Sequence, residues 1–193
     1  MVNKKIKLIG MIAVLSIFAL AVINVPIYTQ EETDNDGMKT GISFDNYVDV
    51  AYKPANSDTW TYLVKGKHNL LVDNGKTYIE TQIGNGSAIA SNSTIYLSLS
   101  DAGTAPAASW VQLPNEISTN GLARTSGTYQ HIAVGQWNFT NTWTATGAQT
   151  VQLAGLNYAA GNSSGNLFAA LQFTQASLAA NDQIRVNWSI TLS

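Results

Sequence analysis

The sequence predicts an all-β fold: a single β-sandwich or jelly-roll-like domain of about eight antiparallel strands. Apolar and polar residues alternate with a period of two from residue 44 onward, as they do in half-buried strands. Turn-rich segments separate these runs. A chain of 193 residues has room for one such domain, preceded by an N-terminal hydrophobic helix and accompanied by one short helix.

Residues 1–29 are predicted to carry the chain to or across a membrane. Lysines precede an apolar run from Leu8 to Ile23, and basic residues stay cytoplasmic while such a run enters the bilayer. Two fates remain open: cleavage as a signal peptide, with Ala19 and Ala21 as the small residues before the cut, or retention as an anchor. Both predict an extracellular protein, at the surface of a cell or a virion.

Residues 30–43 form an acidic segment between this leader and the domain. Glu32, Asp34 and Asp36 resemble the start of a calcium loop. The twelfth position of that loop is Ser43, where a bidentate glutamate is needed. The segment is therefore interpreted as a solvated linker, and the β-sandwich domain is assigned to residues 44–193.

The strands of the domain follow from its alternating apolar positions. A further strand is expected around Thr128–Val134. The alternating positions are, in chain order, Val48, Val50 and Tyr52; Trp60, Tyr62 and Val64; Ile95, Leu97 and Leu99; Trp137, Phe139 and Trp143; Leu167, Ala169, Leu171 and Phe173; and Ile184, Val186, Trp188, Ile190 and Leu192.

Residues 73–83 fit two local structures. Asp73-Asn74-Gly75 is typical of a tight hairpin turn. Tyr78, Ile79, Gln82 and Ile83 have helical spacing, with Gly84 as the stop signal. The helical interpretation is favoured and places a short helix at one end of the sandwich.

Charged residues make up only 11% of the chain, against about 25% in an average domain. From Ala102 onward the charged residues are Glu116, Arg124, Asp182 and Arg185. Nucleic-acid binding is excluded because phosphates require a patch of Lys and Arg. The sequence contains no Cys, which excludes Cys-based metal sites. Such a surface is solvated by hydroxyls and amides, by glycans, or by neighbouring subunits.

No residue pattern predicts catalysis, a cofactor or a metal site. Residues 161–165 match the G-x-S-x-G nucleophile motif, but no histidine follows Ser163 to act as its base. The only histidines, His68 and His131, lack metal-ligand spacing. Nothing places Glu116 and Asp182 in a common cleft, as paired-carboxylate chemistry requires. The protein is therefore predicted not to be an enzyme.

Two kinds of residue are candidates for contact with glycans. In an exported chain, N-x-S/T sequons are candidate glycosylation sites, and Asn138 and Asn187 fall on the polar faces of their strands. Trp110, in the loop between Asp101 and Pro114, is a candidate ligand contact that would stack on sugars; packing is the alternative. The sequons are Asn85, Asn92, Asn138, Asn162 and Asn187.

Short segments spread over residues 66–193 carry a family resemblance by their order: Gly66–Leu71, Gly75–Ile79, Ile95–Ser100, Asn120–Arg124, Thr142–Gly147, Ala154–Leu156 and Asn181–Ile190. In this order they resemble β-sandwich virion structural proteins of tailed phages and archaeal viruses, which are tail-fibre or decoration-type components, with similar domains on secreted archaeal surface proteins. The resemblance implies a non-enzymatic assembly role and carries over no catalytic residue.

The leading hypothesis is a structural subunit of an extracellular assembly, either a surface filament or a viral envelope or appendage protein. Long Thr-, Asn- and Ala-rich strands with few charges are poorly guarded edges, which predicts self-association into a homo-oligomer or filament. The alternative is a membrane-anchored adhesin or carbohydrate-binding module.

Overall fold

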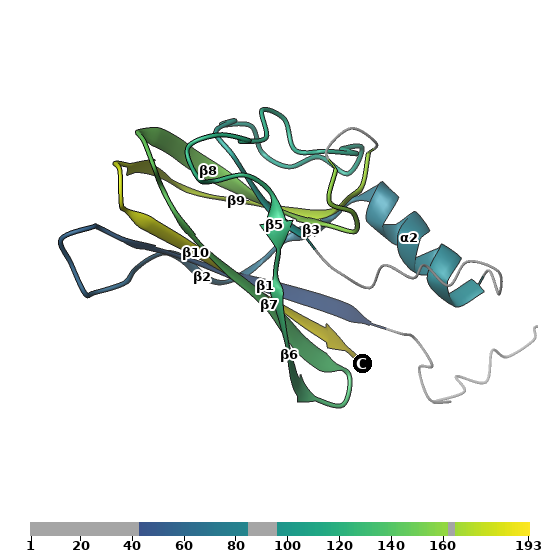
Figure 1. The fold of residues 1–193 in the computed structure, drawn as a ribbon. Coiled ribbons are helices and arrows are strands. Elements are labelled where there is room, and N and C mark those ends of the chain that lie inside the picture. Colours follow the sequence, from purple (N-terminus) through teal and green to yellow (C-terminus); the bar gives the residue numbers. More distant parts are fainter. Residues whose placement is uncertain (1–42, 85–95, 162–164) are drawn as a thin grey trace, which may run out of the picture. The chain divides into compact units, whose positions relative to one another are not determined.

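Ten strands and one helix make up the described part of the chain, which in this computed structural model comprises residues 43–84, 96–161 and 165–193. The strands form two five-stranded antiparallel sheets (Figure 1). The prediction of an all-β sandwich is confirmed, with more than the expected eight strands because two are only two residues long. The predicted N-terminal helix and residues 30–42 of the linker lie outside the described residues.

The first sheet has the strand order β2-β1-β10-β7-β6. Its central strand β10 pairs along its length with β1 and β7, and its alternating residues from Ile184 to Ile190 are buried as predicted. Leu192 is 41% exposed, contrary to its predicted inward position, because it ends the strand beside the β6–β7 turn. The strands are β1 (Phe44–Lys53), β2 (Thr61–His68), β6 (Thr128–Ala133), β7 (Gln136–Thr144) and β10 (Gln183–Leu192).

The second sheet has the strand order β3-β9-β8-β4-β5. Strand β8 was not predicted, because nearly all of its residues from Val151 to Asn157 are buried on both faces and show no alternation. Such continuous burial is expected of a strand covered on both sides. The strands are β3 (Leu70–Leu71), β4 (Tyr96–Ser100), β5 (Thr125–Ser126), β8 (Gln149–Asn157) and β9 (Leu167–Leu178).

The main core lies between the two sheets. Trp188 is completely buried there, and the indole of Trp143 donates a hydrogen bond of 2.8 Å to the Ala123 carbonyl. Helix α2 (Asp73–Gly84) confirms the helical interpretation of this segment, and its Tyr78 and Ile79 pack against the core. Figure 1 shows α2 beside one end of the strands.

A second, smaller apolar cluster covers the outer face of the second sheet. Leu113, from the long segment between β4 and β5, packs there with strand residues such as Leu153 and Leu167. Leu167 was predicted to share a face with Ala169. The register of β8 against β9 shifts between Leu156 and Asn157, and the extra residue turns Leu167 to the opposite face.

A buried ion pair fastens this covering segment. Both nitrogens of the Arg124 fork, Nε and Nη2, donate to Glu116 at 2.8 and 2.6 Å, and the two side chains are 5% and 6% exposed. Arg124 Nη1 also donates to the carbonyls of Ala159 and Gly161 and to Asn166 Oδ1. One guanidinium therefore ties the segment between β4 and β5 to the connection between β8 and β9.

Gly155 provides a test of how closely the covering segment packs. A Cβ at this position would lie 2.8 Å from Ser98 Oγ and 2.9 Å from Leu113 Cδ1. Gly155→Ala is expected to lower the free energy of unfolding by about 1–3 kcal/mol, because the segment must move away. Chemical denaturation measures this change.

Gly84→Ala is the matched control, because a Cβ at Gly84 meets no atom of the described residues within 4 Å. This variant should leave stability unchanged or raise it slightly. Equal stabilities for the two variants would contradict close packing at Gly155.

Candidate functional site

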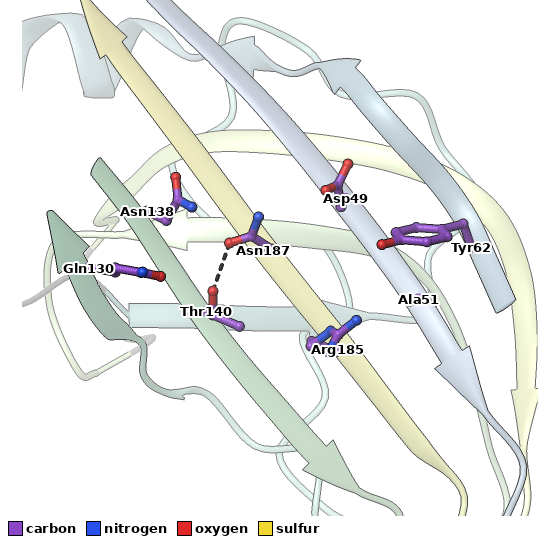
Figure 2. Close-up of a pocket in the computed structure, with 8 residues that line it drawn as sticks. All are labelled: Asp49, Ala51, Tyr62, Gln130, Asn138, Thr140, Arg185 and Asn187. Atoms are coloured by element: carbon purple, nitrogen blue, oxygen red, sulfur yellow. Dashed lines mark hydrogen bonds between the residues drawn. The ribbon is translucent and has the colours of Figure 1, made fainter. Parts of the chain in front are cut away.

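The outer face of the first sheet carries a polar hollow of about 230 Å³ to which all five strands contribute. Figure 2 shows its polar side chains standing on neighbouring strands. The lining residues are Asp49, Ala51, Tyr62, Gln130, Asn138, Thr140, Arg185 and Asn187.

Hydrogen bonds use only part of the polar capacity of the hollow. Thr140 Oγ1 donates to Asn187 Oδ1 at 2.7 Å (Figure 2), and Asp49 Oδ1 accepts the Gly66 N–H at 2.6 Å. Within the described residues, the side chains of Gln130, Asn138 and Arg185 make no hydrogen bond to another lining residue. These groups remain directed at solvent or at a ligand.

Cations and aromatic rings gather at the β1–β2 side of the hollow. The Arg185 guanidinium lies 4.5 Å from the centre of the Trp60 ring, with Lys53 Nζ at 5.5 Å from the same ring. Lys65 Nζ lies 5.1 Å from the centre of the Tyr62 ring. None of these three cations makes an ion pair within the described part of the chain.

The hollow contains two of the predicted glycosylation sites. Asn138 and Asn187 are half-buried on adjacent strands, and the register pairs Asn187 with Thr140 and Asn138 with Ser189. Their positions on the polar face agree with the predicted alternation. The two asparagines are diagonal neighbours, about 7–8 Å apart, so two glycans would start from almost the same point. Asn85, Asn92 and Asn162 lie outside the described residues.

Strand β6 is a second candidate site, because it is an open sheet edge. All six of its residues are exposed, and no other strand of the described chain pairs with its outer edge. The segment from Thr128 to Gln136 contains no charged residue. Tyr129 and Ile132 are at least half exposed, and Val134 is 97% exposed. Figure 1 shows the β6–β7 hairpin extending away from the other sheet.

The other three sheet edges are protected. Strand β2 carries Lys65 and Lys67 and has two register shifts against β1, and strands β3 and β5 have only two residues each. Lysines, irregular pairing and short strands all discourage pairing with a second chain. Strand β6 has no such feature along its regular stretch Thr128–His131.

The predicted ligand contact Trp110 is half-buried and packs against the small cluster on the second sheet. Its role as a ligand contact stays a prediction. His68 and His131 lie on the two opposite edge strands of the first sheet. The described residues include no group of three or more His, Asp or Glu placed to hold a metal ion. They also contain no helix with the length and apolarity needed to span a membrane.

The carboxylates of Glu116 and Asp182 form hydrogen bonds that hold parts of the fold together, and the serine motif does not have the strand–helix context of a nucleophile. Glu116 binds Arg124, whereas Asp182 lies in the β9–β10 turn and accepts hydrogen bonds from Tyr52 of strand β1 and from Ala55 of the β1–β2 loop. Residues 161–165 connect strand β8 to strand β9, but a nucleophile elbow requires a strand followed by a helix. Ser163 itself is outside the described residues.

Neither the hollow nor the β6 edge was singled out from sequence. Alternation places Asn138, Arg185 and Asn187 on outward faces, but it does not show which strands are neighbours. The clearest sequence signal was the uncharged stretch around His131. No protein-family model matches this chain, and no curated protein matches it.

Asp182 gives a prediction about acid stability. The Ala179 N–H, the Ala55 N–H and the Tyr52 hydroxyl all donate to its carboxylate, and the backbone bond from Ala179 is the main reason that its pKa is lowered below 3.8. A carboxyl group whose pKa is lower in the folded than in the unfolded state stabilises the fold fully at pH values above its unfolded-state pKa. This contribution is lost as the pH falls through its folded-state pKa. Asp182→Asn should cost about 1–3 kcal/mol at neutral pH.

Urea denaturation over a pH series measures the effect. The stability difference between wild type and Asp182→Asn should shrink as the pH falls below 3.8. Asp58→Asn, an exposed residue of the β1–β2 loop, is the control and should change stability by at most about 0.5 kcal/mol. A difference for Asp182→Asn that is constant with pH would contradict the assignment.

Proposed function

We propose that this protein is a non-enzymatic structural subunit that assembles with further copies of itself in an extracellular filament, envelope or appendage. The observation that carries the proposal is the free edge of β6. Its backbone N–H and C=O groups offer a template on which another strand pairs, as in β-strand addition.

The apolar side chains at this edge support the same role. Ile132, Val134 and Leu192 lie around the β6–β7 turn, where the Leu192 N–H donates to the Gly135 carbonyl. A neighbouring copy that continues the sheet beyond β6 also covers these side chains, and burial of apolar surface favours association. The hairpin thus supplies both hydrogen-bonding groups and apolar area.

Two sequence features support the extracellular setting. The apolar run at residues 8–23 follows lysines, as in exported or anchored proteins. Short segments within residues 66–193 follow one another in an order that resembles virion structural proteins. The carbohydrate-binding alternative through Trp110 has less support, because the ring packs against apolar neighbours.

A lysine on the β6 edge tests the proposal. The full-length protein in detergent should form concentration-dependent oligomers, measured by sedimentation velocity, and filaments or sheets visible by electron microscopy. Ile132→Lys should weaken association about tenfold or more, because each interface would bury or juxtapose new charges. The β6 edge has no charge of its own to balance them.

Val111→Lys is the matched control, because Val111 is 51% exposed and Ile132 is 50% exposed. Val111 lies in the segment that covers the second sheet, where its carbonyl accepts the Leu167 N–H, and it is not part of the β6 edge, so its variant should associate like wild type. Wild-type protein that stays monomeric at high concentration would refute the proposal, as would equal effects of both lysines.

A further inference from the structure

We infer that the hollow on the outer face of the first sheet binds an acidic saccharide, with the ligand's carboxylate at Arg185 and its hydroxyl groups at the surrounding amides. The inference does not rest on the assembly proposal, although Gln130 of strand β6 is one of the residues that line the hollow. The site also differs from the predicted Trp110 contact, which belongs to the other sheet.

The charge distribution selects an anionic ligand. Of the six Lys and Arg residues in the described part, Arg185 lines the hollow. Lys53 shares the Trp60 ring with Arg185, and Lys65 lies against the lining residue Tyr62. Arg124 and Lys76 are paired with carboxylates, and Lys67 donates to the Gln172 carbonyl. Lys53, Lys65 and Arg185 have no ion-pair partner among the described residues, and a guanidinium is suited to bind a carboxylate with two parallel hydrogen bonds.

The aromatic rings position these cations. Trp60 is half-buried and holds Arg185 over its face at 4.5 Å. Such stacking orients the planar fork and leaves its edge N–H groups available to a ligand. Because Arg185 also lines the hollow, its donors are presented to whatever enters.

The remaining lining groups suit hydroxyls. Gln130, Asn138 and Asn187 offer amide donors and acceptors, and Tyr62 is 47% exposed. Amides pair with sugar hydroxyls because both donate and accept hydrogen bonds. The hollow spans five strands, which matches an extended ligand of several sugar rings.

Asp49 argues against phosphate as the ligand. Its carboxylate lines the hollow and would repel a dianion, but it can accept hydrogen bonds from hydroxyl groups. A ligand with hydroxyls along its length and one carboxylate per ring fits both the anionic and the cationic parts of the hollow. These are the features of a uronic-acid oligosaccharide.

The test compares an acidic oligosaccharide with its uncharged methyl ester. Full-length protein in detergent, produced without N-glycosylation and checked by intact mass spectrometry at Asn138 and Asn187, is titrated by calorimetry with a galacturonic acid trimer and with its methyl ester. The acid should bind at least about tenfold more tightly, and rising salt should weaken its binding.

Variants locate the site. Arg185→Gln should weaken binding of the acid about tenfold or more and leave the small affinity for the ester unchanged. Lys76→Gln is the control, because it removes one positive charge from helix α2 and should bind like wild type. Circular dichroism melting establishes that both variants are folded. Arg185→Lys keeps the charge without the planar fork and should bind the acid with an intermediate affinity. This variant tests the same site if Arg185→Gln does not fold.

Other outcomes would overturn the inference. No binding of the acid, equal binding of acid and ester, or unchanged binding by Arg185→Gln would each do so. Inorganic phosphate that binds more tightly than the trimer would show a simple anion site. Tighter binding of a peptide with the acidic sequence of residues 30–40 would show that the hollow takes the chain's own linker.

Normal trimer binding by Ile132→Lys would show that the hollow and the assembly edge are separate.

Discussion

The buried ion pair between Glu116 and Arg124 is the interaction on which the arrangement of this protein depends. It holds the long segment between β4 and β5 over the outer face of the second sheet and joins it to the β8–β9 connection. With that face covered, the second sheet is buried on both sides. The first sheet keeps an open outer face, so the hollow and the free β6 edge both belong to it. An ion pair of this kind is strongly destabilising when one partner is lost, because the other charge stays buried.

The scarcity of charge makes the position of each charged residue informative. Glu116 and Arg124 hold the covering segment, and Asp182 fastens the β9–β10 turn to Tyr52 of strand β1 and to Ala55 of the β1–β2 loop. Lys65 and Lys67 lie on the protected edge β2. The β6 edge has none. The charged residues thus stabilise the fold or lie at one side of the hollow. The uncharged β6 edge of the same sheet remains suited to contact with another chain.

Individual elements show how far sequence reasoning reached. The inward series of β10 from Ile184 to Ile190 is confirmed because that strand has one buried face and one polar face. The same rule failed for β8, which has no polar face to mark it. It also misplaced Leu167, since the register shift inserts an extra residue between Leu167 and Ala169 and turns Leu167 to the opposite face. For Trp110, the loop position indicated exposure, but the cluster beneath it became visible only with the second sheet in place.

The sequence by itself determined the all-β class and the outward faces that carry Asn138 and Asn187, and it favoured a short helix over a hairpin turn at residues 73–83. Each of these depends on spacing between residues close together in the chain, which periodicity reports directly. Tertiary structure alone decided that β1, β10 and β7 are neighbours, that the second sheet is covered, and that β6 is left at an edge. Strand neighbours are chosen by hydrogen bonding and packing between distant segments, so a hollow built from five strands leaves no local pattern.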